Sequence, residues 1–291
     1  MSLFSRAKDK KLPARLPARA RRAGGPQFVD VHAHVAFPEY DHDRGAVCDR
    51  MRLADVRAFT VGVDLESSKR AVQMANQYAE LSAIVGLHPT DTKDESFDRE
   101  AYLDLADNID VVGVGECGLD YYRIEPYDTG EKERQKTEFI KQVEFALEAD
   151  LPLMLHCRPQ KGTMDAYEDV LAVLKPYAKE HGKKLRGNVH FFVGDKTIAD
   201  AYLELGFTLS FTGVITFAHD YDDVIRGIPL NMILAETDSP FVAPEPYRGK
   251  RNEPVNVRAV VKRIAELKDR PLEVVGAQIV QNTYRAFPVS E

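Results

Sequence analysis

The residues with the clearest chemical potential lie in one apolar stretch, 28–35, with the sequence Phe-Val-Asp-Val-His-Ala-His-Val. Its β-branched residues predict a buried strand, in which successive side chains alternate between two faces. The polar face would hold Asp30, His32 and His34, and the apolar face Val29, Val31 and Val35. Two neutral core histidines satisfied by hydrogen bonds are the alternative. We favour a shared divalent cation, because burying two imidazoles without a ligand is costly.

Four other polar residues occupy matching places near the ends of later predicted strands. Glu116 closes the fourth strand, His156 closes the fifth, His190 lies late in the sixth and Asp238 closes the eighth. Four imidazoles and two carboxylates exceed the three protein ligands of a catalytic zinc. Two divalent metal ions sharing a carboxylate accommodate them better. Mixed donors suit Zn²⁺ or Mn²⁺ more than Mg²⁺, which prefers oxygen, and the sequence leaves the metal open.

The elements that must position these residues alternate along the chain. Strands are expected at 28–35, 58–63, 82–88, 111–118, 151–158, 186–192, 207–213 and 232–238. Helices, with apolar residues three and four apart, are expected at 44–56, 66–80, 98–107, 131–149, 164–181, 196–205, 220–227, 254–268 and 271–286. This alternation predicts an α/β fold, a (β/α)₈ TIM barrel with extra C-terminal helices. An open doubly wound sheet would need a G-x-G-x-x-G after the first strand, which is missing.

The barrel prediction explains where the polar residues fall. In a TIM barrel the loops after the strands build the active site. All six candidates lie at the C-terminal ends of their strands, namely His32, His34, Glu116, His156, His190 and Asp238. Histidines scattered through a core would have no reason to choose one end, so the agreement favours a single site.

Composition narrows the class of protein. The chain has 291 residues, 44% of them hydrophobic, which is enough for a large core. It contains no apolar run of the roughly 18 residues that a membrane helix needs. The three cysteines are odd in number and lack C-x-x-C spacing, which argues against disulfides and a zinc knuckle. We expect a soluble, cytoplasmic protein, monomeric and without an obligate protein partner.

Charge separates the first residues from the rest. Residues 1–25 contain eight Lys and Arg and one acid, a net charge of +7. Because the whole chain has a net charge of −7, the remaining residues carry −14. With two prolines, two glycines and no apolar periodicity, residues 1–26 are predicted to be a disordered basic arm before one domain at 27–291. A tail that contacts nucleic acid and an organelle transit peptide remain alternatives.

Seven ordered blocks give the chain a family resemblance. They are Phe-Val-Asp-Val-His-Ala-His at 28–34, Val-Gly-Leu-His-Pro at 85–89, Val-Gly-Val-Gly-Glu-Cys-Gly-Leu-Asp-Tyr-Tyr at 112–122, Leu-His-Cys-Arg at 155–158, Asn-Val-His-Phe-Phe at 188–192, Leu-Ala-Glu-Thr-Asp-Ser-Pro at 234–240 and Arg-Gly-Lys-Arg-Asn-Glu-Pro at 248–254. From residue 28 to 287 the chain resembles TatD-type metal-dependent deoxyribonucleases of the amidohydrolase superfamily. The resemblance implies a TIM barrel and a divalent-metal-dependent nuclease, several members being 3′→5′ exonucleases on DNA.

The resemblance also implies a ligand set. His32, His34, Glu116 and Asp238 would hold one metal, and Glu116, His156 and His190 the second, with Glu116 bridging. The chain departs from the family at Phe191, where a cysteine is usual, and at Thr90, where a histidine is common. Neither position is a family ligand, so the departures bear on substrate preference.

Most of the remaining candidates have two interpretations. Asp238 could accept a proton from the attacking water or cap a helix. Arg158 could bind a phosphate in a bidentate fashion. Arg248, with its basic neighbours, could steady a phosphodiester or be a solvated charge. Tyr121 and Tyr122 could stack on a base or pack on the rim. His88 is a candidate for a substrate contact or a support of the ligands.

Three functions follow from these residues. The first is hydrolysis of DNA, or of RNA, with Asp238 and Glu116 as catalytic residues acting on single-stranded 3′ ends. The second is hydrolysis of a small amide, lactone or ester; many superfamily relatives with that chemistry bridge their metals with a carboxylated lysine, where this chain has Glu116. The third is a nucleic-acid-binding protein without catalysis, which the filled ligand positions make less attractive.

Overall fold

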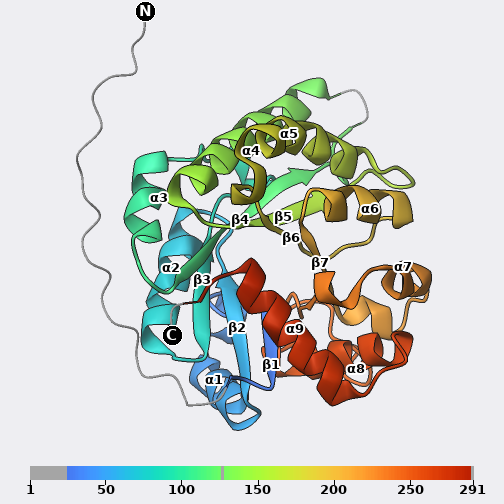
Figure 1. The fold of residues 1–291 in the computed structure, drawn as a ribbon. Helices are drawn as coiled ribbons and strands as arrows, with labels where there is room; N and C mark the ends of the chain where they lie inside the picture. Colours follow the sequence, from blue (N-terminus) through green and yellow to red (C-terminus); the bar gives the residue numbers. More distant parts are fainter. Residues whose placement is uncertain (1–24, 126–127, 290–291) are drawn as a thin grey trace, which may run out of the picture.

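The computed structural model describes residues 25–125 and 128–289, and the predicted basic arm at 1–26 lies almost entirely outside them. Eight parallel strands follow one another in the order β1 to β8, with helices between them on the outside (Figure 1). The predicted TIM barrel is therefore confirmed. None of the described helices is long and apolar enough to cross a membrane.

The elements lie close to their predicted positions. The strands are β1 (Phe28–Ala33), β2 (Val56–Val61), β3 (Leu81–Val85), β4 (Val111–Asp120), β5 (Leu153–Arg158), β6 (Gly187–Val189), β7 (Thr208–Phe211) and β8 (Ile233–Ala235). The helices are α1 (Arg44–Leu53), α2 (Leu65–Gln77), α3 (Arg99–Ala106), α4 (Thr129–Ala149), α5 (Asp165–His181), α6 (Lys196–Glu204), α7 (Asp222–Gly227), α8 (Val257–Leu267) and α9 (Leu272–Ala286). Short 3₁₀ helices in the described connections are η1 (Pro38–Tyr40), η2 (Asp91–Lys93), η3 (Gly182–Lys184), η4 (Gly213–Thr216), η5 (Leu230–Met232) and η6 (Pro254–Asn256).

The barrel closes between β1 and the residues after β8. The Asp238 amide donates to the His32 carbonyl at 2.9 Å, and the His34 amide donates to the Ser239 carbonyl at 2.7 Å. Ala33 and Ser239 form a parallel bridge beside them. The closing hydrogen bonds thus belong to the same residues, or their neighbours, that were predicted to bind metal.

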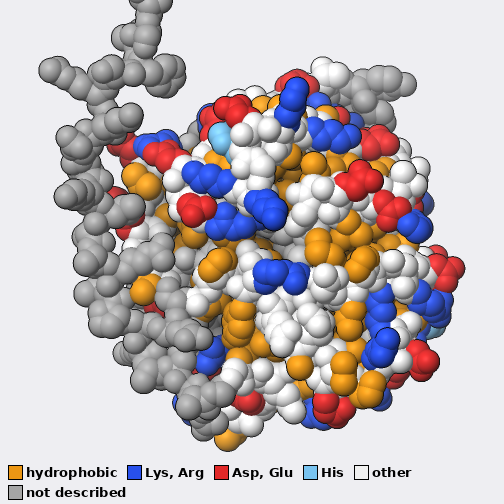
Figure 2. All heavy atoms as spheres, viewed as in Figure 1, with side chains coloured by type: hydrophobic (Ala, Val, Ile, Leu, Met, Phe, Trp, Pro, Cys, Tyr) orange, Lys and Arg blue, Asp and Glu red, His pale blue; other side chains and the backbone are white. Residues whose placement is uncertain are grey.

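Two hydrophobic cores lie on either side of the strands. The outer core packs the helices against the barrel, and the inner core fills the barrel itself with side chains from several strands. The inner core includes Val29, Val31, Phe59, Val61, Ile84, Val112, Met154, Leu234 and Phe287. Helix α9 crosses one end of the barrel and delivers Phe287 to it, fully buried (Figure 1). On the molecular face seen from the α9 side, charges of both signs are intermixed (Figure 2).

The regular alternation predicted for the first strand is wrong. Val29 and Val31 lie in the inner core, whereas Val35 lies in the outer core. The pairing of β1 with β2 shifts between Asp30 and Ala33, where two residues of β1 oppose one of β2. Such a bulge changes the face on which the following side chains lie. The Asp30 carboxylate, which was predicted to share a face with His32 and His34, accepts a hydrogen bond from the Thr237 amide at 2.9 Å.

Candidate metal centre

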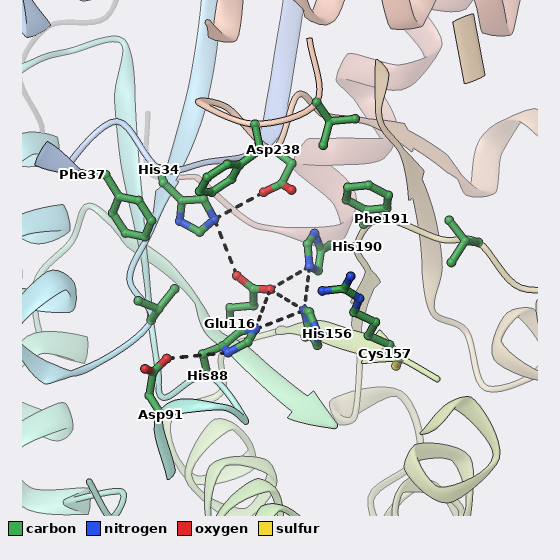
Figure 3. Close-up of a pocket in the computed structure, with 15 residues that line it drawn as sticks. His34, Phe37, His88, Asp91, Glu116, His156, Cys157, His190, Phe191 and Asp238 are labelled. Atoms are coloured by element: carbon green, nitrogen blue, oxygen red, sulfur yellow. Dashed lines mark hydrogen bonds and ion pairs between the residues drawn. The ribbon is translucent and has the colours of Figure 1, made fainter. Parts of the chain in front are cut away.

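Six polar residues predicted to form one site do meet at the C-terminal end of the barrel. Figure 3 shows five of them, His34, Glu116, His156, His190 and Asp238. They come from β1 and its end, β4, β5, the end of β6 and the end of β8. The side chains of His32, His34, Glu116 and His190 are at most 5% exposed, and those of His156 and Asp238 are 14% exposed. The site is therefore a buried polar cluster that opens to solvent on one side.

Glu116 lies at the centre of the cluster, and its two oxygens face different neighbours. Oε2 is 3.2 Å from Nε2 of His32 and 3.7 Å from Nε2 of His34. Oε1 is 2.6 Å from Nδ1 of His156 and 2.8 Å from Nε2 of His190. Asp238 joins the first group, with Oδ1 3.4 Å from Nε2 of His34. The arrangement has two halves that share one carboxylate.

Backbone irregularities aim Glu116 at its neighbours. The pairing of β4 with β5 shifts between Val114 and Cys117, so Gly115 and Glu116 together oppose Met154. At Gly115, φ is +153° and an added Cβ would lie 2.5 Å from the Met154 carbonyl oxygen, so only glycine fits this turn of the strand. The corresponding bulge of β1 carries His32. Bulges of this kind re-aim side chains beside active sites.

Three imidazoles have their outer ring nitrogen held by an acceptor. Nδ1 of His34 is 3.0 Å from the Val61 carbonyl oxygen. Nδ1 of His190 is 3.3 Å from a Glu236 carboxylate oxygen, and Nε2 of His156 is 3.1 Å from an Asp120 oxygen. Each of these oxygens accepts a hydrogen bond from the N–H of the outer nitrogen. The inner nitrogen of each neutral ring therefore carries a lone pair.

The inner nitrogens then face one another at short range. Nδ1 of His156 lies 3.3 Å from Nε2 of His190, and Nε2 of His32 lies 3.3 Å from Nε2 of His34. Two lone pairs at this distance repel unless a proton or a cation lies among them. The His32 and His190 rings also stack with centroids 3.8 Å apart, which holds the two halves together.

Burial and neighbouring charges set the protonation of the cluster. Burial raises the pKa of Glu116, but the surrounding imidazoles, His190 and His32 first, hold that pKa well below its usual value. Burial lowers the pKa of His190, but Glu116 and Glu236 outweigh it and raise that pKa well above its usual value. Burial, together with the charge of His156, lowers the pKa of His88 to about 3. Glu116 is therefore an anion beside a protonated His190, whose proton a cation can replace.

A cavity of about 520 Å³ lies above the cluster. Phe37, Phe191 and Phe241 give it aromatic walls, and Arg158 is the only Lys or Arg among its described lining residues. The Arg158 guanidinium lies 4.1 Å from the centroid of the Tyr122 ring and makes no ion pair within the described parts of the chain. An anion entering the cavity would therefore meet an arginine that is not already neutralised.

Strand β4 extends two residues beyond its predicted end, and this overturns one prediction. The strand runs to Asp120, so alternation turns Tyr121 away from the site. Tyr121 is fully buried, and its hydroxyl donates to Asp169 of α5 at 2.9 Å. The prediction that Tyr121 stacks over the site is wrong.

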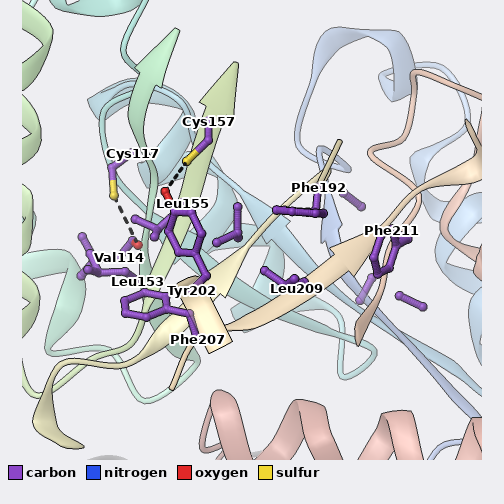
Figure 4. Packing of buried hydrophobic residues seen from close by; sticks show 14 of the residues in the cluster. Val114, Cys117, Leu153, Leu155, Cys157, Phe192, Tyr202, Phe207, Leu209 and Phe211 are labelled. Carbon is purple, nitrogen blue, oxygen red and sulfur yellow. Dashed lines mark hydrogen bonds between the residues drawn. The ribbon is translucent and has the colours of Figure 1, made fainter. Parts of the chain in front are cut away.

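The same extension reveals a residue that sequence reasoning missed. Asp120 lies four residues after Glu116 and holds the outer nitrogen of His156. Even spacing along the strand was the signal, but it was hidden by ending the strand at residue 118. On the outer face of the same strands, Cys117 and Cys157 are buried packing thiols, and Cys157 lies 3.5 Å from the Tyr202 hydroxyl (Figure 4).

The other candidates have distinct places. His88 lines the cavity with Arg158, whereas Arg248 is not among its lining residues and stacks on Phe217 at 3.7 Å. Asp238 caps no helix, because the next described helical turn, η6, begins at Pro254. The helix-cap interpretation of Asp238 is therefore wrong, and its carboxylate faces His34 instead.

Comparison with known proteins decides the family. The family described as TatD related DNase matches residues 29–288, which is nearly all of the described chain. The chain belongs to this family.

Relatives of this TatD-related chain carry both general and specific names. A Bacillus subtilis protein named as the uncharacterized metal-dependent hydrolase YabD is 36% identical, over 90% of this chain and 100% of its own length. The 3′-5′ ssDNA/RNA exonuclease TatD of Escherichia fergusonii is 28% identical, over 90% of this chain and 100% of its own. The crystal structure of YjjV, a TatD homologue from Escherichia coli, matches with a TM-score of 0.79 and 28% identity, over 90% of this chain and 98% of that one. Family membership places the chain among metal-dependent hydrolases.

The donor set fits the metals expected of a TatD-related protein. Donor atoms of His32, His34 and Glu116 all lie within 4.8 Å of one another, as do those of His88, Glu116 and His156. Imidazole nitrogens with outer hydrogen bonds and shared carboxylates are the usual environment of Zn²⁺, Mn²⁺ and similar ions. The clusters are therefore able to bind metal.

Proposed function

We propose that this protein is a metal-dependent phosphodiesterase that removes nucleotides from single-stranded ends of DNA or RNA. In this proposal His32, His34, Glu116 and Asp238 hold one divalent cation, and Glu116, His156 and His190 hold a second. The observation that carries it is the Glu116 carboxylate, whose two oxygens face two separate groups of imidazoles. When bound, such a pair of cations would activate water and offset the negative charge of a phosphodiester.

The cavity supports a flexible substrate rather than a duplex. The donor atoms lie beneath its rim, since the Glu116 and His190 side chains are only 5% and 4% exposed. A phosphate can reach them only if its strand bends inwards, and aromatic walls suit an unpaired base. In this proposal Arg158, which lines the cavity, binds a phosphate oxygen with its paired N–H groups. Asp238, at the open side, accepts the proton of the attacking water.

The relatives support the same choice. One curated relative is named an exonuclease for single-stranded DNA and RNA. The alternative, a hydrolase of a small amide, lactone or ester, draws support from the cavity volume of about 520 Å³, which is also suitable for a small ligand. The carboxylate at residue 116, where such enzymes often carry a modified lysine, favours the nuclease.

One assay separates the two functions. Metal-reconstituted protein is incubated with end-labelled single-stranded DNA and RNA, with the matching duplex, and with a panel of lactones and dipeptides. We expect mononucleotides from the single strands and little from the blunt duplex. Glu116→Gln should abolish release, whereas Glu148→Gln, the same change at an exposed carboxylate paired with Arg99, should not. Turnover of a lactone or dipeptide without nucleotide release would reject the proposal.

A further inference from the structure

His88 lies close enough to the metal centre to be taken for another ligand. It follows β3, and its amide is anchored to the Val63 carbonyl oxygen at 2.7 Å. Its Nε2 is 3.3 Å from Nδ1 of His156 and 3.5 Å from Oε1 of Glu116 (Figure 3). Distance alone therefore does not distinguish a ligand from a group that acts on the substrate.

The outer nitrogen of His88 distinguishes the two roles. The Thr90 amide donates a hydrogen bond to Nδ1 of His88 at 3.2 Å, and a backbone amide can only donate. The Thr90 hydroxyl lies 2.7 Å from the same nitrogen and can donate as well. Nδ1 therefore carries a lone pair, so the ring proton is on Nε2, the atom that faces the site.

This is the reverse of the arrangement at the proposed ligands. The outer nitrogens of His34, His156 and His190 lie against oxygen acceptors, which leaves lone pairs on their inner nitrogens. At His88 the amide of Thr90 donates to the outer nitrogen at 3.2 Å, whereas the nearest Asp91 carboxylate oxygen lies farther from that nitrogen, at 3.7 Å and beyond hydrogen-bonding distance. The inner nitrogen of His88 therefore presents a proton. A cation needs a lone pair, whereas an anionic oxygen needs a proton donor.

We propose that His88 is a catalytic hydrogen-bond donor, whose neutral imidazole offers its Nε2 proton to an oxygen of the scissile phosphodiester. The identity of that substrate rests on the proposed function; the position of the proton does not. Thr90 is the positioning residue, because its amide sets the tautomer of the ring.

The reaction then balances without a proton from His88. The water oxygen forms a bond to phosphorus, its proton passes to the Asp238 carboxylate, and the bond from phosphorus to the leaving oxygen breaks. The leaving oxygen takes a proton from solvent. Because loss of the Nε2 proton would leave an imidazolate anion, His88 keeps that proton and stabilises negative charge on the phosphate as it develops. A neutral histidine that polarises an oxygen is known from other barrel enzymes.

Nuclear magnetic resonance tests the tautomer directly. The full-length protein, loaded with diamagnetic Zn²⁺ and carrying ¹⁵N-labelled histidine, should show His88 with a protonated Nε2 and an unprotonated Nδ1; His88→Gln assigns the signal. Thr90→Val keeps the amide and should keep this tautomer. Thr90→Pro removes the amide at a residue whose φ of −73° suits proline, and should let the other tautomer appear. A protonated Nδ1 in the parent protein would overturn the proposal.

Kinetics and metal content test the role. His88→Met removes the donor and should lower kcat by about 10²–10³-fold with KM and bound metal unchanged. His88→Gln keeps a neutral N–H near the same place and should restore most of kcat. The ratio of parent to His88→Met rates should stay constant with pH, because no proton is transferred. Loss of metal from both variants, with kcat restored by added metal, would make His88 a ligand and refute the donor role.

The outcomes also separate this inference from the proposed function. If the parent protein cleaves no phosphodiester, the function fails, yet the tautomer and the metal content still decide whether His88 is a donor or a ligand. If it cleaves phosphodiesters and His88→Met is as fast as the parent protein, the function survives and the donor role is rejected.

Discussion

The two ends of the barrel are both buried but are built from opposite chemistry. At the N-terminal end, the Phe287 ring packs edge-on to Phe59 with centroids 5.4 Å apart, among aliphatic side chains. At the C-terminal end, four imidazoles crowd around Glu116. Apolar burial stabilises a fold, whereas buried polar groups lower its stability unless they are paired. The comparison indicates that one end serves mainly stability and the other mainly function.

Metal removal should show the largest contrast between the ends. A strong chelator should lower hydrolysis at least about 10³-fold, because the catalytic charge stabilisation is lost. The circular dichroism spectrum should change little, since none of the proposed metal ligands belongs to the inner or the outer core. The melting temperature should fall by only a few degrees through lost ligand binding. Unfolding upon mild chelation would mean that the metal end also holds the barrel together.

Phe287→Ala should have the opposite effect, lowering stability while leaving activity unchanged. Loss of this buried ring should lower the free energy of unfolding by about 3–5 kcal/mol, because a cavity forms at the closed end. Urea denaturation measures that change, and kcat of the folded variant should be unaffected. Phe241→Ala is the matched control at the other end, where the ring is 46% exposed and its loss should cost little stability. A large fall in kcat for Phe287→Ala would couple the two ends.

A smaller effect is expected from the residues that orient the histidines. Asp120→Asn and Glu236→Gln should each weaken metal affinity about 10–100-fold, because His156 and His190 lose the carboxylates that hold their outer nitrogens. Isothermal titration with Zn²⁺ or Mn²⁺ measures the affinity. Asp169→Asn, which alters a carboxylate bonded to Tyr121 on the outer face, provides the control and should leave affinity unchanged.

The smallest effect, for a change of one pH unit, is expected in the dependence of metal affinity on pH. The pKa of His190 is raised by Glu116 and Glu236 against the effect of burial, so the metal-free site binds a proton that a cation must displace. Affinity should therefore fall as pH decreases from about 8 to about 5.5, by up to about tenfold per pH unit for each proton released. A competition assay with a chromophoric chelator follows it. Affinity that rises toward acid pH would contradict the assigned proton.

The predictions that depend on local sequence patterns were confirmed, whereas some that depend on strand pairing were wrong. The helical and strand periods are local, so the eight strands and nine helices within residues 25–125 and 128–289 were placed to within a few residues. The predicted faces of some side chains were wrong. One extra residue in β1 places Val35 in the outer core, whereas Val29 and Val31 lie in the inner core. Tyr121 was misplaced for a similar reason, since pairing with β5 extends β4 to Asp120.

The barrel, the residue types at its C-terminal rim and the likeness to TatD-type enzymes could all be inferred from the amino-acid sequence. This was possible because alternating hydrophobic periods and short motifs are written in neighbouring residues. The folded barrel was needed to show which oxygen of Glu116 faces which histidine, that Asp120 holds His156, and that the Thr90 amide donates to His88. Those features depend on bulges and on contacts between distant strands, and the packing of the whole barrel sets both.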